Sequence, residues 1–230
     1  MNWYVFTGTV ATVSMFVPAL LILIFKLFNK FSLLILSVYY ILTGFFNLMN
    51  QGLITVPGPF QNKVGVLFNY LDAPMMLMVL LFFCTERWKR KTINYSLALY
   101  GLYEVVIFYL FRLSPQSSVY VLGPGILLVL CYSIYLFFQQ GKLTVMYGKG
   151  LGLTLMLVSI LFSYGCFSFI YVLYYIKKTS ALADVFLIYY IVLFISSVLL
   201  SLGIIWLHKR IRNINEVQVS RKELAHFFEV

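Results

Sequence analysis

The sequence predicts an all-α integral membrane protein, built as one bundle of seven transmembrane helices. Of its 230 residues, 62% are hydrophobic and only 10% are charged. Soluble domains are about 25% charged, so this composition excludes a water-soluble fold. Apolar runs of about twenty residues, long enough to cross a hydrocarbon core of roughly 30 Å, recur seven times along the chain.

Short polar, basic or Pro/Gly-containing links separate these runs and fix the approximate limits of each expected span. The expected spans cover residues 3–27, 31–54, 64–91 with a basic end, 93–113, 120–140, 151–176 and 185–207. Residues 1–207 therefore form the predicted transmembrane domain, and residues 208–230 form a short basic tail.

The first two spans contain few features that point to function. Trp3 fits an aromatic anchor at the membrane interface, and Pro18 predicts a kink in the first helix. In the second span, Asn50 lies three positions after Asn47, so the two side chains share one helix face.

The third span contains an embedded acid. Gly65, Asn69 and Asp72 recur at intervals of four and three residues, so they form a stripe along one face. Pro74 follows two residues after Asp72 and leaves the backbone carbonyl of Tyr70 without its helical partner. A carboxyl group inside a membrane is costly, so Asp72 is a candidate functional residue.

The remaining spans supply a second acid and further polar groups. Glu104 lies near the centre of the fourth span, and we expect Pro124 in the first turn of the fifth helix, where proline is tolerated. In the sixth span, Tyr164 and Ser168 begin a polar stripe that continues toward its end.

Basic residues predict the orientation of the bundle. With the N-terminus outside, 13 of the 17 Lys and Arg residues lie at the inner ends of the spans or in the tail. The positive-inside rule therefore favours an external N-terminus and a cytoplasmic C-terminus. The same placement explains the net charge of +10 by orientation and anionic lipid, and argues against nucleic acid as a partner.

In this orientation, several polar groups share the outer half of the bundle. We expect one outward-facing cavity, with Glu104 at or below its floor. The candidate ligand- or ion-binding residues are Asp72, Glu104, Asn47, Asn50, Asn69, Tyr164 and Ser168. Amides can also simply hold helices together, so a structural role for the asparagines stays open. The sequence leaves open the protonation of both acids.

The chemistry missing from the sequence argues against an enzyme without settling the question. The two histidines, His208 and His226, both lie in the tail, and the three cysteines are isolated in apolar runs. There is no HExxH or GxSxG motif. We therefore expect no catalytic residues, no metal and no cofactor.

Two functions from different classes lead. The first is a receptor- or sensor-like module that binds a small or lipophilic ligand and signals through a protein partner at its cytoplasmic face. The alternative is a proton- or cation-coupled transporter or channel that uses Asp72 and Glu104. A third interpretation is a structural subunit of a membrane complex. The short loops favour a prokaryotic inner membrane. The sequence leaves open the helix order, the oligomeric state and the ligand.

Overall fold

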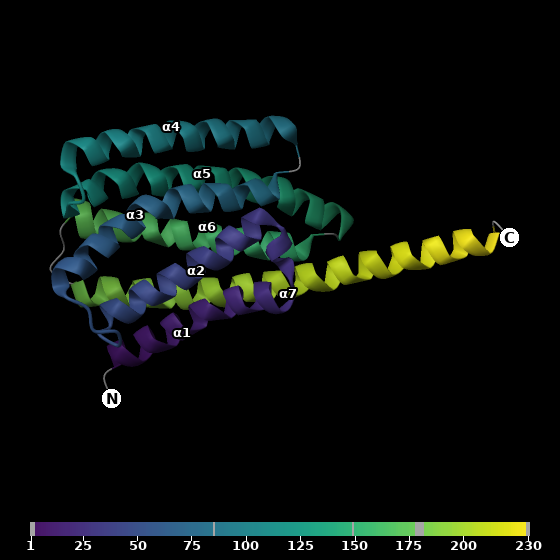
Figure 1. Ribbon diagram of the computed structural model, residues 1–230, viewed down its shortest axis with the longest axis horizontal. Helices are drawn as coiled ribbons and strands as arrows, with labels where there is room; N and C mark the ends of the chain where they lie inside the picture. Colours follow the sequence, from purple (N-terminus) through teal and green to yellow (C-terminus); the bar gives the residue numbers. More distant parts are fainter. Residues whose placement is uncertain (1–2, 85, 149, 178–181, 229–230) are drawn as a thin grey trace.

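Seven long helices form almost the whole of the computed structural model, which describes residues 3–84, 86–148, 150–177 and 182–228 (Figure 1). All seven are long and apolar enough to cross a membrane. The helices are α1 (Trp3–Ile24), α2 (Phe31–Asn50), α3 (Gly58–Leu80), α4 (Arg87–Phe111), α5 (Pro115–Tyr147), α6 (Leu151–Tyr171) and α7 (Leu182–Phe228). Short 3₁₀ turns, η1 (Leu27–Asn29) and η2 (Leu81–Phe83), and a π-helical segment, η3 (Val172–Ile176), complete the described secondary structure.

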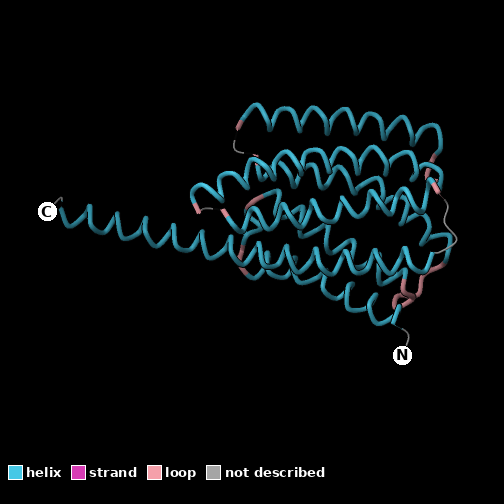
Figure 2. Tube along the Cα trace, turned by 180° about the vertical axis from the view of Figure 1, so that it is seen from behind, coloured by secondary structure: helices cyan, strands magenta, loops and turns pink. Residues whose placement is uncertain are grey.

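Helices that follow one another in the chain are neighbours in the bundle, and α1 packs against α7 to close it. Apart from α4, the order around the bundle is therefore the order along the chain. Helix α3 also packs against α5, which leaves α4 outermost, as both views show (Figures 1 and 2). The multi-pass, all-helical prediction is confirmed.

The antiparallel helices give the bundle two distinct ends. We call the end that carries the N-terminus, with the α2–α3, α4–α5 and α6–α7 connections, the N-terminal end (Figure 1). The opposite end, the C-terminal end, carries the other three connections, and α7 projects from it beyond the other helices (Figures 1 and 2). The predicted orientation assigns the N-terminal end to the outside.

Helix α5 begins earlier than expected. Ser114 caps its first turn by accepting a hydrogen bond from the backbone N–H of Ser117, and Pro115 is the proline in the first turn. Pro124 therefore lies inside the helix and cannot donate to the carbonyl of Tyr120. The Tyr103 hydroxyl on α4 donates to that carbonyl instead, over 2.9 Å.

Two other helices are also longer than expected. Helix α3 begins at Gly58, directly after Pro57, rather than at residue 64. Helix α7 does not end at Leu207 but continues to Phe228 as one helix of 47 residues. The sequence after residue 207 contains no glycine or proline and is rich in strong helix formers, so nothing in it terminates the helix.

Helices α6 and α7 pack most closely where two glycines face each other. A Cβ added to Gly152 would lie 2.6 Å from the backbone nitrogen of Leu207 and 2.7 Å from the carbonyl oxygen of Gly203. Small residues allow helix backbones to approach in this way inside membranes. Further along, the Ser159 hydroxyl donates to the Ser196 carbonyl over 2.7 Å, which links the same two helices.

Candidate ligand-binding cavity

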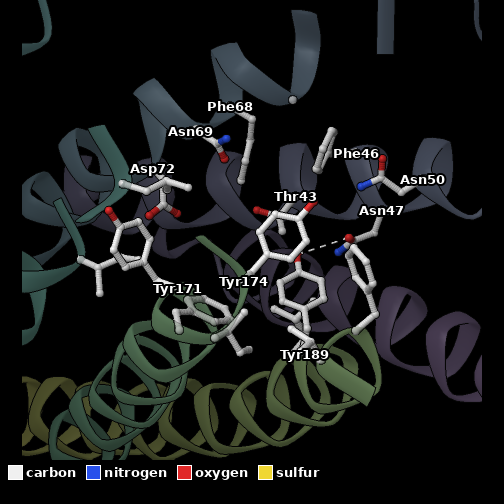
Figure 3. Close-up of a pocket in the computed structure, with 18 of the residues that line it drawn as sticks. Thr43, Phe46, Asn47, Asn50, Phe68, Asn69, Asp72, Tyr171, Tyr174 and Tyr189 are labelled. Atoms are coloured by element: carbon white, nitrogen blue, oxygen red, sulfur yellow. Dashed lines mark hydrogen bonds between the residues drawn. The ribbon is translucent and has the colours of Figure 1, made fainter. Parts of the chain in front are cut away.

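A cavity of about 630 Å³ opens among the helices at the N-terminal end of the bundle (Figure 3). Its walls come from residues 39–50 of α2, 62–72 of α3, 122–126 of α5, 167–171 of α6, 174–175 of η3 and 185–193 of α7. The lining residues are Tyr39, Thr43, Phe46, Asn47, Asn50, Asn62, Gly65, Phe68, Asn69, Asp72, Leu122, Ile126, Phe167, Ile170, Tyr171, Tyr174, Tyr175, Val185, Phe186, Tyr189, Tyr190 and Leu193.

Asp72 is the acid of this cavity, and two tyrosines hold its carboxyl group. Its side chain is only 7% exposed. The Tyr39 hydroxyl on α2 donates to Oδ1 over 2.8 Å, and the Tyr164 hydroxyl on α6 donates to Oδ2 over 3.0 Å. These bonds connect α3 to α2 and α6 and orient both carboxyl oxygens. Hydrogen bonds donated to an ionised carboxylate are stronger than those between neutral groups.

Asn47 occupies the opposite part of the cavity from Asp72, as Figure 3 shows. Its side-chain oxygen accepts a hydrogen bond from the Tyr189 hydroxyl on α7 over 3.3 Å. Its side-chain nitrogen donates to the sulfur of Met15 on α1, also over 3.3 Å. The buried amide therefore joins three helices, and Tyr189 is positioned as part of the wall.

The rim of the cavity beyond Asn47 is polar and accessible. Asn50 and Asn62 are both exposed, and the Asn50 side-chain oxygen accepts a hydrogen bond from Gln61 over 3.0 Å. On the other side of the rim, Phe186 is 41% exposed and Tyr174 is 37% exposed. A molecule can therefore enter between polar and aromatic side chains.

Aromatic rings make up a large part of the cavity walls. The rings of Phe46 and Phe68 stack with centroids 5.6 Å apart and an interplanar angle of 11°. Across the cavity, Phe167 lies 5.7 Å from the ring of Tyr189. Tyr174 belongs to η3, a π-helical turn of the kind that often occurs at functional sites.

The lining residues reach no deeper toward the C-terminal end than Tyr39, Asp72, Ile126 and Leu193. Below this level α3 continues as Met75–Leu80, a fully apolar stretch in which Leu77 and Leu80 are 0% exposed. The cavity therefore ends beside Asp72, above a closely packed apolar core.

The structure brings together five of the seven residues proposed from the sequence. Asn47, Asn50, Asn69 and Asp72 line the cavity, and Tyr164 lies behind Asp72 as its hydrogen-bond donor. The other two, Ser168 and Glu104, are not among the lining residues, and each lies elsewhere.

The Ser168 hydroxyl donates to the carbonyl of Gly165 in its own helix over 2.8 Å. Glu104 lies on α4, and its Oε1 is buried without a hydrogen-bond partner. The two embedded acids, Asp72 and Glu104, are therefore not part of one cavity.

Several residues of this site are absent from the sequence-based set. Tyr39 and Thr43 precede Asn47 at intervals of four residues, so extending that stripe by two turns would have identified both. The role of Tyr189 has no such signal, because its neighbours in the sequence are other large apolar residues.

The polar groups of the cavity are of kinds that can form hydrogen bonds to a ligand. Among the described residues, no group of three or more His, Cys, Asp and Glu side chains is placed to hold a metal ion. The polar groups that line the cavity are amides, hydroxyls and one carboxyl group, set among aromatic rings. Such a mixture of apolar walls and a few fixed polar groups is typical of ligand pockets.

No protein-family model matches the chain, and neither the curated proteins nor the solved structures contain a match. The chain is a multi-pass membrane protein with seven helices, and the cavity is the feature of it that points to a function.

Proposed function

We propose that this protein is a receptor- or sensor-like module that binds a small or lipophilic ligand in the cavity and signals through a partner protein. The observation that carries the proposal is the shape of the cavity, which is open at the N-terminal end and closed beneath Asp72. Its volume of about 630 Å³ falls within the roughly 300–1,000 Å³ of ligand pockets. We place this end outside a prokaryotic inner membrane.

Helix α7 supplies the connection between ligand and partner in this proposal. Residues Val185 to Leu193 of α7 line the cavity, and the same helix continues to the C-terminal end. There it carries Lys209, Arg210 and Arg212. A basic segment at the cytoplasmic surface of a membrane attracts anionic lipids and acidic partner surfaces, so this end is the docking region we propose.

The test uses a variant that fills the cavity. Asn69 lies in the wall beside Phe68 (Figure 3), so Asn69→Phe places a ring in the cavity. Leu67→Phe is the matched control, because Leu67 is on the same helix, is 50% exposed and does not line the cavity. Purified protein is screened against a metabolite library by thermal unfolding, since a ligand that binds only the folded state stabilises it.

The proposal predicts a ligand that raises the unfolding temperature of the wild type and of Leu67→Phe but not of Asn69→Phe. A ligand that stabilises all three proteins equally binds outside the cavity. Absence of any stabilising compound, with folded protein and a library that covers amines, alcohols and fatty acids, contradicts the proposal.

A proton- or cation-coupled carrier is the second candidate, and the placement of Asp72 favours it. The acid lies inside a span, two residues before Pro74, which interrupts the hydrogen bonding of α3. Flux in liposomes that disappears in Asp72→Asn would support the carrier. Equal flux in wild type, Asp72→Asn and Glu104→Gln would exclude the mechanism that uses these acids.

A further inference from the structure

We infer that the ligand is a protonated amine attached to an aromatic or aliphatic group, with its N–H groups donating to Asp72 and its charge lying against the aromatic rings. This inference rests on the proposed function, since it names the chemical class of the molecule that the cavity binds.

The described residues that line the cavity include no positive charge to balance an ionised Asp72. Both groups that donate to its carboxyl oxygens are neutral tyrosine hydroxyls. Of the described residues that line the cavity, none is Lys, Arg or His. A buried charge without a partner of opposite sign is strongly unfavourable. A positively charged ligand supplies the missing partner.

The carboxylate of Asp72 can accept more hydrogen bonds than the two tyrosines donate to it. An ionised carboxylate accepts at about four lone-pair positions, and the two tyrosines use one position on each oxygen. Asp72 itself lines the cavity, so its remaining acceptor positions are available from that side. An amine with at least one N–H can fill them, whereas a neutral alcohol would leave the charge uncompensated.

The walls of the cavity are rich in aromatic rings. Ten of the 22 lining residues are Tyr or Phe. The ring of Phe68 lies 5.9 Å from that of Tyr39, whose hydroxyl binds Asp72, so aromatic surface continues directly from the acid. Aromatic faces attract organic cations within about 6 Å of the ring centroid, and more strongly where water is excluded.

Among the described residues, the lysines near the rim do not provide an internal counter-ion. Lys63 lies between the lining residues Asn62 and Gly65 of α3, and Lys177 follows η3, but both side chains are exposed and neither lines the cavity. The organic part of the ligand has room in the remaining volume, between the acid and Asn47 (Figure 3). The geometry therefore favours an amine at one end of an extended apolar or aromatic molecule.

The experiment compares amines with alcohols of matched shape on the purified full-length protein. The pairs are 2-phenylethylamine and 2-phenylethanol, tryptamine and tryptophol, and dodecylamine and dodecanol, measured by equilibrium dialysis at pH 7. We expect at least one amine to bind roughly thirtyfold or more tightly than its alcohol, which is the scale of an unpaired buried charge. Because this comparison uses the wild type, it does not depend on the folding of a variant.

Variants then locate the effect. Asp72→Asn should reduce amine binding by a similar factor and leave alcohol binding unchanged. Glu104→Gln is the matched control, since it neutralises the other embedded acid, which lies outside the cavity, and should leave amine binding unchanged.

Each outcome separates the two proposals. Alcohols that bind as well as amines, and lose affinity in the cavity-filling Asn69→Phe, overturn the amine inference but support a ligand-binding cavity. Amine binding that survives Asp72→Asn overturns the role of Asp72. Absence of binding by every amine and alcohol overturns the inference, and the wider library screen then decides the proposed function.

Discussion

The contact between α6 and α7 at Gly152 leads to a sharp prediction about stability. In Gly152→Ala, the new Cβ would lie 2.6 Å from the backbone nitrogen of Leu207 and 2.7 Å from the Gly203 oxygen. Favourable contacts between such atoms are about 3.5–4.0 Å long, so the helices must separate by about 1 Å. The obstructing atoms are backbone atoms, and no side-chain rotation can relieve the overlap.

The cost follows from what this separation disrupts. Overpacking of this kind typically costs about 1–3 kcal/mol. The Ser159 hydroxyl bond to the Ser196 carbonyl, now 2.7 Å long, lies about 10 Å further along α6 and would lengthen beyond hydrogen-bonding range if the helix moved rigidly. Such a bond contributes about 0.6 kcal/mol in a membrane. Alanine regains up to about 1 kcal/mol of helix propensity, so a net loss of roughly 1–3 kcal/mol remains.

The matched control is Gly165→Ala on the same helix. Apart from its chain neighbours and the backbone of its own helix turns, no atom lies within 4 Å of a Cβ placed there, so this variant should gain about 0.5–1 kcal/mol from propensity alone. Equilibrium unfolding of both variants in mixed micelles measures the difference. If Gly152→Ala is as stable as Gly165→Ala, the close approach of α6 and α7 is not a feature of the folded protein.

Three further predictions test the acid site, the end of α7 and the orientation. Tyr164→Phe removes one of the two donors to Asp72 and should lower the free energy of unfolding by roughly 1–2 kcal/mol in the same assay. An unchanged free energy of unfolding would show that this hydrogen bond does not form. Removal of residues 215–230 should leave the unfolding temperature unchanged, since α7 extends there beyond the other helices (Figures 1 and 2); a large decrease would show that the segment contributes to the bundle. The orientation is tested with single cysteines on a background without the natural cysteines. A cysteine at Gly52 should react with a membrane-impermeant maleimide added to intact cells, whereas a cysteine at Lys142 should react only after lysis. The reverse pattern of labelling would invert the proposed orientation.

Much of the architecture follows directly from hydrophobic length, because a spanning helix requires about twenty apolar residues. The errors lie at the helix ends, where local signals compete. Pro124 was expected to start α5, yet Ser114 and Pro115 form a better start, a side-chain cap followed by a first-turn proline. The sequence around Leu207 contains no stop signal, and α7 accordingly continues.

The site was predictable to the extent that it depends on helix periodicity. Asn47, Asn50, Asn69 and Asp72 are spaced for one face of each helix, and the structure places all four along one cavity. Periodicity fails for contacts between distant helices. The bonds from Tyr39 and Tyr164 to the same carboxyl group join residues 33 and 92 positions away from Asp72, and depend on how α2, α3 and α6 pack.

For Glu104, the sequence indicates that the residue is unusual but not where it lies in the bundle. The cost of an embedded acid identifies it as unusual, but does not indicate which side of α4 meets the rest of the protein. Because α3 packs directly against α5, α4 is displaced to the outside, and its acid is separated from the cavity.

The uninterrupted α7 has a mechanical consequence. Its 47 residues form a rod about 70 Å long, with the cavity wall near one end and the projecting segment at the other. No proline divides it, so a change of direction imposed beside Leu193 is not absorbed by a hinge of that kind. From Leu193 to the end of α7 the helix is about 50 Å long, so a tilt of about 3° at the cavity would carry the far tip sideways by roughly 3 Å. A small change of direction beside the ligand thus becomes a shift of a few ångströms at the opposite surface of the membrane.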